Sequence, residues 1–126
     1  MLVLDSGGFS RLSSRTKTAA ALIRAFADQD LWPPVVSTMV LVESLRGDSR
    51  SDVNAHRFLK TCIVDSKVSK QTARRAAELR RRAGTGSAVD ALVVAMAEPG
   101  GTVLTGDRKD IEALAAVADD VAVETV

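Results

Sequence analysis

Short apolar runs alternate with segments of helical periodicity along this chain of 126 residues. The runs have the length of strands that are buried on both faces, and short polar connections separate them from the helical segments. We expect strands at 2–4, 35–37, 62–64, 102–105 and 121–126, and helices at 17–28, 69–83, 87–97 and 107–117. Such an alternation predicts a mostly parallel sheet with helices on both faces. The sequence therefore predicts one α/β domain over residues 1–126, in three α/β/α layers.

Local signals refine these helices. The run Trp32-Pro33-Pro34 ends the first one, because proline disfavours helix at its own position and at the one before it. After the strand at 35–37 we expect a helix that carries Glu43 and ends at Gly47 as a C-cap, and a weak helical pattern follows at 55–59. The segment 87–97 is apolar nearly all round and predicts a buried helix. In the helix at 69–83, the residues expected to face inward are Ala73, Ala76, Ala77 and Leu79.

Four carboxylates stand at the edges of apolar runs, namely Asp5, Glu43, Asp90 and Asp107. Burying an isolated carboxylate costs several kcal/mol, so four separate ones would burden a small domain. They are explained if the fold gathers them around a divalent cation, since Mg²⁺ and Mn²⁺ prefer carboxylate oxygen. Asp5 and Asp107 follow strands, and ligands of parallel sheets bind at the carboxyl ends of strands.

Each acid also has a local interpretation. Asp90 fits a capping box with Ser87, and Asp107 could cap the last helix, with Asp110 in its first turn. Asp5 could be an ordinary turn residue. Glu43 is the least easily explained, because valine, leucine and methionine surround it. The ordered set of four on an alternating chain favours a shared site.

The charge distribution is uneven although the net charge is only +1. Seven basic residues and the single acid Glu78 lie between Lys67 and Arg82, and the balance is acidic after Asp107. A cationic strip beside an anionic pocket is typical of an enzyme that cleaves a polyanion, but a solvated helix face has the same pattern.

Other chemistries have little support. The single cysteine, Cys62, excludes an internal disulfide, and with one histidine, His56, a Cys/His zinc site is implausible. We interpret His56 as a surface residue and Cys62 as a small buried one. Three Phe and one Trp are too few for a base-stacking platform. We find no secretory signal and no apolar run of membrane-spanning length, so a cytoplasmic protein without membrane contact is expected.

The ordered motifs resemble those of PIN domains, and more narrowly the VapC-type ribonuclease toxins of bacterial toxin–antitoxin operons. The motifs are Val3-Leu-Asp5-Ser6, Val40-Leu-Val-Glu43, Asp90-Ala-Leu-Val-Val-Ala-Met-Ala97 and Leu104-Thr-Gly-Asp107. The resemblance implies that Asp5, Glu43, Asp90 and Asp107 form an acidic quartet that binds Mg²⁺ or Mn²⁺, with Asp5 and Asp90 as central ligands. It places Asp110 where a further, less regular acid is often found. Ser6 and Thr105 would orient carboxylates or water, and Arg80, Arg81 and Arg82 would line the RNA path.

By the same resemblance the chain would be a metal-dependent endoribonuclease with an RNA substrate, a small cognate antitoxin and a homodimeric state. Operator DNA would be bound by the antitoxin and not by this chain alone. A catalytically weak PIN-like binding module and a phosphorylated receiver-type domain are the alternatives, although the latter lacks a second acid beside Asp5.

Two departures from the family pattern have expected consequences. Gly7 and Gly8 after the first acid are expected to loosen that loop, and Glu98-Pro-Gly-Gly101 is an unusual turn.

Replacing Asp5 by asparagine is expected to keep the fold, abolish cleavage and relieve repulsion among the acids.

Overall fold

The computed structural model describes all residues from 1 to 126 and contains one sheet of five parallel strands. The strands are ordered β3-β2-β1-β4-β5, so the first strand of the chain lies in the centre. Val3 of β1 is in register with Val35 of β2 on one side and with Val103 of β4 on the other. The strand bounds are β1 Leu2–Leu4, β2 Val35–Ser37, β3 Ile63–Asp65, β4 Thr102–Thr105 and β5 Ala122–Thr125.

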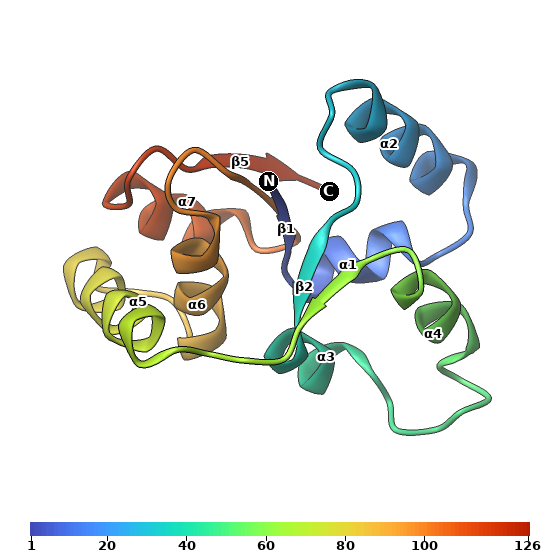
Figure 1. Ribbon diagram of the computed structural model, residues 1–126, viewed down its shortest axis with the longest axis horizontal. Helices are drawn as coiled ribbons and strands as arrows, with labels where there is room; N and C mark the ends of the chain where they lie inside the picture. The colour runs from blue at the N-terminus through green and yellow to red at the C-terminus, as the bar shows by residue number, and fades with distance from the viewer.

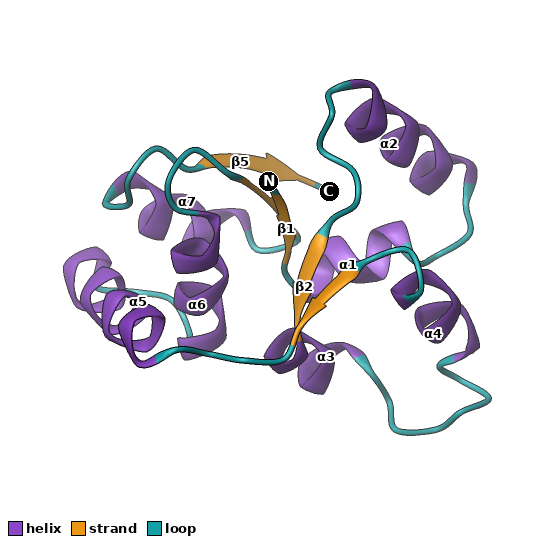
Figure 2. Cartoon of the chain, viewed as in Figure 1, coloured by secondary structure: helices purple, strands orange, loops and turns teal.

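Seven helices cover the sheet. Figure 1 shows α5, α6 and α7 on one side of the strands and α1, α2 and α4 on the other. Most connections between these elements are short, as the colouring by secondary structure in Figure 2 makes visible. The three-layer α/β/α architecture predicted from the sequence is therefore confirmed. The helix bounds are α1 Ser6–Leu12, α2 Lys17–Asp28, α3 Thr38–Ser44, α4 Val53–Leu59, α5 Lys70–Ala83, α6 Ala88–Ala97 and α7 Arg108–Ala116.

The core explains why the central strands read as continuous apolar runs. Every residue of β1 is fully buried, as expected for a parallel strand that is covered on both faces. On one side it is covered by α6, which buries four consecutive residues, Ala91 to Val94. Near α1 and α4 the rings of Phe9 and Phe58 meet edge to face with centroids 5.6 Å apart. No helix of the structure is long and apolar enough to cross a membrane.

Three local expectations were wrong. No helix was predicted after Asp5, yet α1 begins at Ser6 and includes both Gly7 and Gly8. The helix that carries Glu43 ends at an extended C-cap, Leu45, and not at Gly47. Its end differs because the N–H groups of Arg46 and Gly47 donate to the carboxylate of Asp52, at 3.0 and 2.9 Å, rather than to carbonyls of the last helical turn.

The inward face of α5 is also narrower than predicted. Ala76 and Leu79 are buried, but Ala73 and Ala77 are exposed. These two alanines lie along a hollow between α5 and α6 instead of packing into the core.

Candidate metal centre

The carboxyl ends of the central strands bring several acids to one edge of the sheet. Asp5 directly follows β1 and is the N-cap of α1, while Asp107 follows β4 and is the N-cap of α7. Asp110 lies in the first turn of α7, and Asp90 lies in the first turn of α6. Because parallel strands end at the same edge, two strand ends and two helix N-termini supply these side chains.

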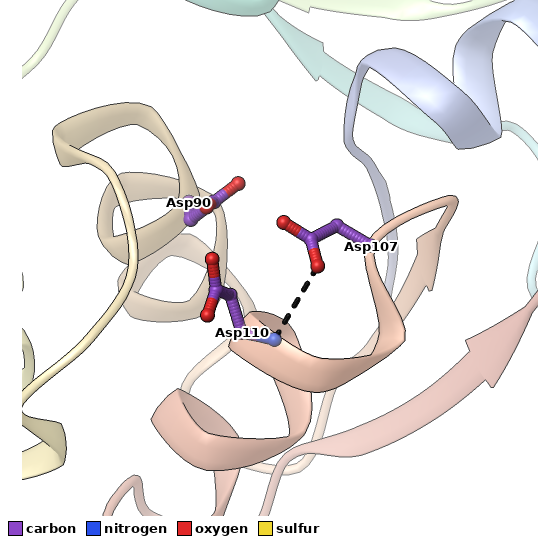
Figure 3. Close-up of side chains that lie close together, drawn as sticks. All are labelled: Asp90, Asp107 and Asp110. Atoms are coloured by element: carbon purple, nitrogen blue, oxygen red, sulfur yellow. Dashed lines mark hydrogen bonds between the residues drawn. The ribbon is translucent and has the colours of Figure 1, made fainter.

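Three of the acids form a compact group. Asp90, Asp107 and Asp110 each offer a carboxylate oxygen, and these oxygens all lie within 4.8 Å of one another. Figure 3 shows their carboxylates directed toward a common space between α6 and α7. Asp90 and Asp110 are half-buried and Asp107 is exposed, so the group is open to solvent on one side.

Local hydrogen bonds hold each of the three carboxylates by one oxygen only. Asp90 Oδ2 accepts from the Ser87 N–H at 3.1 Å, which completes a capping box, and Asp107 Oδ1 accepts from the Asp110 N–H at 3.4 Å. Asp110 Oδ1 accepts from the Thr85 hydroxyl at 2.7 Å. The capping interpretations of Asp90 and Asp107 are confirmed. In all three acids the second oxygen has no protein donor.

This donor set fits a hard divalent cation. Three carboxylates with one uncommitted oxygen each suit Mg²⁺ or Mn²⁺, which bind few carboxylates and keep several waters. No cysteine or histidine lies in the group, so softer metals are not favoured.

Asp5 lies deeper than the group and is not one of its three members. It is only 5% exposed, and its Oδ1 accepts from the N–H groups of Gly8 at 2.8 Å and Gly106 at 3.3 Å. Its Oδ2 accepts from the Thr105 hydroxyl. The oxygen of that hydroxyl in turn accepts from the Asp107 N–H at 2.7 Å, so Thr105 connects the buried acid to the exposed one.

Glu43 lies apart from these hydrogen bonds. It is exposed near the end of α3, which turns Val40 toward the core and leaves Val42 77% exposed. The Glu43 side chain takes part in none of the structure's hydrogen bonds or ion pairs. Of the four acids grouped by the sequence, two lie in the compact group, Asp5 is joined to it through Thr105, and the role of Glu43 stays a prediction.

Ser6 and Thr105 were both expected to orient carboxylates or water, and the structure places the two residues differently. Thr105 is fully buried, and its hydroxyl is hydrogen-bonded to both Asp5 and Asp107. Ser6 is the first residue of α1 and half-buried, and its hydroxyl makes none of the structure's hydrogen bonds.

The three arginines expected along an RNA path differ in their surroundings. Arg80 donates to the Gly86 carbonyl at 3.0 Å, and Arg82 donates to the Val117 carbonyl at 3.4 Å. Arg81 is exposed at the end of α5 and makes no such bond. Two of the three therefore tie α5 to neighbouring segments, and their contact with RNA stays a prediction.

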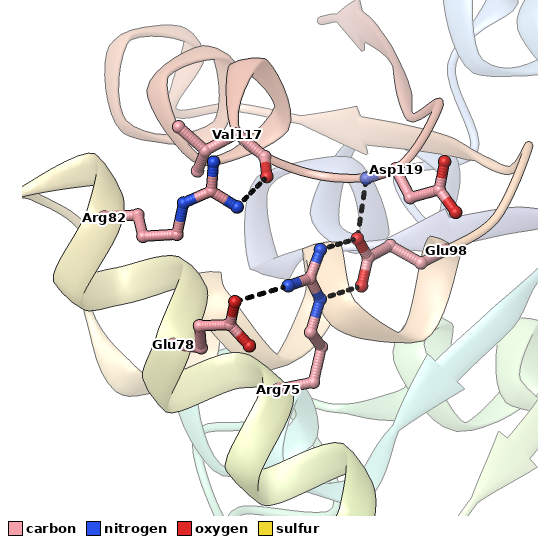
Figure 4. Close-up of polar contacts among 6 residues, drawn as sticks. All are labelled: Arg75, Glu78, Arg82, Glu98, Val117 and Asp119. Atoms are coloured by element: carbon pink, nitrogen blue, oxygen red, sulfur yellow. Dashed lines mark hydrogen bonds and ion pairs between the residues drawn. The ribbon is translucent and has the colours of Figure 1, made fainter.

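Arg75, which is also among the seven basic residues between Lys67 and Arg82, forms an internal ion pair. Arg75 binds Glu98 through two bonds of 2.8 and 2.7 Å and also contacts Glu78 at 3.1 Å (Figure 4). The Asp119 N–H donates to the same Glu98 carboxylate at 2.6 Å. The bonds from Arg75 hold the pKa of Glu98 below its ordinary value, and those to the two glutamates raise the pKa of Arg75.

Two polar residues with clear structural roles were missed by the sequence reasoning. Thr85 precedes the capping box and donates to Asp110, and no sequence pattern distinguishes it from any loop threonine. Asp52 is buried, and the backbone N–H of Arg46 is the main reason that its pKa is lowered. The available sequence signal was an Asp just before the weak helical pattern.

Cys62 was expected to be a small buried residue and His56 a surface residue. Cys62 is half-buried, and burial raises the pKa of its thiol to about 11. His56 is exposed on α4, outside the acid group.

An apolar hollow lies outside the acid group. It has a volume of about 420 Å³ and is lined mostly by apolar side chains of α5 and α6, with Met39 of α3 at its border. Arg80 is its only charged lining residue.

No family model matches this sequence, and no curated protein matches it. Solved structures do resemble it. VapBC2 from Rickettsia felis, bound to a DNA fragment from its promoter, matches with a TM-score of 0.70 at 13% identity over 100% of this chain and 99% of that one. A toxin–antitoxin complex from Klebsiella pneumoniae matches with a TM-score of 0.65 at 22% identity over 87% and 89% of the two chains. FitAB bound to an IR36 DNA fragment matches with a TM-score of 0.66 at 20% identity over 99% and 94%.

These neighbours confirm the structural part of the resemblance seen in the sequence motifs. They match over nearly the whole length of each chain, and identities of this size carry the fold alone. The chain thus has the α/β fold of these three solved structures, one of which is a toxin–antitoxin complex.

Proposed function

We propose that this chain is a metal-dependent endoribonuclease that acts as the toxin of a toxin–antitoxin pair. The observation that carries the proposal is the meeting of Asp90, Asp107 and Asp110, whose oxygens lie within 4.8 Å at the carboxyl edge of the sheet. Acids gathered there without a neutralising lysine or arginine are costly unless a cation joins them. The fold shared with toxin–antitoxin proteins supports the same assignment.

The residues have separable roles in this proposal. Asp90, Asp107 and Asp110 would hold Mg²⁺ or Mn²⁺ through the carboxylate oxygens that their hydrogen bonds leave uncommitted. Asp5, anchored by three donors, would sit behind them and fix Asp107 through Thr105. A cation held by these residues would supply the positive charge that stabilises phosphate oxygens and lowers the pKa of a bound water.

The remaining steps belong to the protein itself. Asp107 is exposed, so a phosphodiester can approach the group from solvent. No histidine lies there, and a carboxylate is the available general base for the attacking water. Arg81 is exposed at the end of α5 and is the arginine of the three best able to contact the RNA backbone.

The proposal extends to partners. A small antitoxin would bind the toxin and block the acid group, and recognition of DNA would belong to that partner. A homodimer in the cytoplasm follows from the same family resemblance.

A second candidate is a catalytically weak binding module of the same fold. It is favoured by the position of Glu43, which is exposed and outside the acid group, so that the expected quartet is incomplete in this structure. The apolar hollow of about 420 Å³ would then be a docking surface.

Cleavage of a mixed RNA pool by the purified protein separates the two candidates. We expect cleavage with Mg²⁺ or Mn²⁺, none in excess EDTA and none with Asp90→Asn under any condition. Asp28→Asn is the matched control, because it removes the same charge from an exposed position at the end of α2. A folded protein that leaves RNA intact with either metal would refute the nuclease and favour the binding module.

A further inference from the structure

The loop between α5 and α6, residues 84–87, touches two of the three grouped acids. Ser87 at its end donates its N–H to Asp90. Thr85 in its middle donates its hydroxyl to Asp110 at 2.7 Å, across 25 positions of the chain. One short loop therefore contacts acids that belong to two different helices.

The loop is itself held in place from three sides. Gly84 ends α5 in the left-handed conformation with φ of 70°, and Arg80 donates to the carbonyl of Gly86 at 3.0 Å. Gly86 has φ of 95° and packs so closely on α7 that a Cβ there would lie 2.7 Å from Leu114 Cδ1. A hydroxyl carried by such a segment has a fixed position relative to α7.

From these contacts we propose that Thr85 is a positioning residue that holds the Asp110 carboxylate in the orientation required for a cation shared with Asp90 and Asp107. The inference rests on the proposed function. It assigns the orientation of the Asp110 carboxylate to a residue that lies outside the acid motifs. The Thr85 hydroxyl occupies Oδ1 of Asp110 and leaves Oδ2 for the cation. The hydroxyl is neutral and donates a single hydrogen bond, so it adds no positive charge that would compete with a metal ion.

The hydrogen bond also offsets part of a repulsion. Three carboxylates within 4.8 Å repel one another, and Asp110 can relieve this by rotating away from the other two. A donor on the loop opposes that rotation. Without it we expect Asp110 to sample other rotamers and to bind the cation less often.

Arg80 has a related place in this arrangement. Its contact with Gly86 explains one member of the Arg80–Arg82 cluster as an anchor of the loop. Fewer arginines of this cluster therefore remain available to contact a polyanion.

The test is binding of Mn²⁺ alone to the purified protein, followed by electron paramagnetic resonance or calorimetry. Thr85→Val removes the hydroxyl at nearly constant volume, and we expect it to weaken Mn²⁺ binding by roughly 10- to 100-fold. Thr85→Ser keeps the hydroxyl and should restore the affinity to within about threefold of the native protein. In an Asp110→Ala background, Thr85→Val should have no further effect, because the two residues act as one unit.

Thr61→Val is the control for a general loss of stability. The Thr61 hydroxyl also makes a part-buried bond of 2.7 Å, to the Phe58 carbonyl. Thr61 follows α4, which lies on the other side of the strands from α6 and α7 (Figure 1). We expect this variant to bind Mn²⁺ like the native protein.

The outcomes separate the two proposals. Native-like Mn²⁺ binding by a folded Thr85→Val protein would overturn the role of Thr85 and leave the nuclease proposal standing. A native protein that binds no Mn²⁺ would overturn both.

Discussion

Asp5 and Asp107 are both N-caps at the same edge of the sheet, yet their surroundings differ. Asp5 is buried and accepts three hydrogen bonds, two from backbone N–H groups and one from Thr105. Asp107 is exposed and has two other carboxylates beside it. The negative charge of Asp5 is thus stabilised by hydrogen-bond donors, whereas the negative charge of Asp107 is repelled by the two neighbouring carboxylates.

This difference changes the expected effect of Asp5→Asn on stability. The sequence suggested that loss of this charge would relieve repulsion, but the donors around Asp5 indicate a loss of about 1–2 kcal/mol, because charge-assisted bonds become neutral ones. Asp107→Asn keeps a good N-cap and removes repulsion, so its free energy of unfolding should stay within about 0.5 kcal/mol of native or rise. Urea unfolding in EDTA measures both. Equal destabilisation by the two substitutions would contradict this account.

At the scale of the element, α1 shows how glycine can be required inside a helix. A Cβ at Gly8 would lie 2.3 Å from the carbonyl oxygen of Leu104, and one at Gly7 would lie 2.6 Å from Gly106 Cα. The two glycines let α1 lie directly on the backbone at the end of β4. The expectation that they loosen a loop was wrong, since they sit in a helix that packs closely.

Gly8→Ala tests this close approach. We expect a loss of about 3 kcal/mol in the free energy of unfolding, because the added methyl group must push α1 away from β4. Alanine otherwise favours helix, so a stabilised variant would refute the packing argument. Ser10→Ala, at an exposed position of the same helix, is the control and should be nearly neutral. Thermal or urea unfolding of both variants gives the comparison.

The ion pair between Arg75 and Glu98 joins α5 to the end of α6 and should make stability depend on pH. The pKa of Glu98 is lowered in the folded state, chiefly by its hydrogen bonds to Arg75. The stabilisation is therefore present above the unfolded pKa of about 4.3 and is lost as the pH falls through the lower folded value. Because 30% of the Arg75 side chain is exposed, we expect Glu98→Gln to cost about 1 kcal/mol near pH 7.

Unfolding free energies of the native protein and Glu98→Gln, measured from pH 7 down to pH 2, check this expectation. The difference between them should be constant above about pH 5 and should shrink at more acidic pH. Glu112→Gln removes a partner from the exposed pair with Arg108 and should change stability by less than about 0.5 kcal/mol. A difference for Glu98→Gln that persists unchanged at pH 2 would exclude the ion pair as its cause.

For the molecule as a whole, the sequence predicted what is local and periodic. The strands β1, β2 and β4 appear as continuous apolar runs because both of their faces are covered, and α2 has the predicted bounds. The capping box of Ser87 and Asp90 was also readable, since its partners are three residues apart.

What the sequence could not predict depends on contacts between distant segments. The helix α1 was missed because its glycines have low helix propensity and are required by contact with Leu104 and Gly106. The exposure of Glu43 depends on the rotation of α3 about its axis, which neighbouring apolar residues do not reveal. The approach of Asp110 to Asp90 follows from the packing of α6 on α7, and no spacing encodes it.

The central place of β1 has a consequence for the order in which the protein can be made. Leu2 is in register with Thr102, and Asp5 is bonded to Thr105, 100 positions later. During synthesis the first strand therefore gains its second neighbour only after β4 has been made. Asp90 likewise emerges before Asp107 and Asp110, so an incomplete chain holds only one member of the group. If the acids do cut RNA, a ribosome that makes this protein is not exposed to its activity until the chain has been made as far as Asp110.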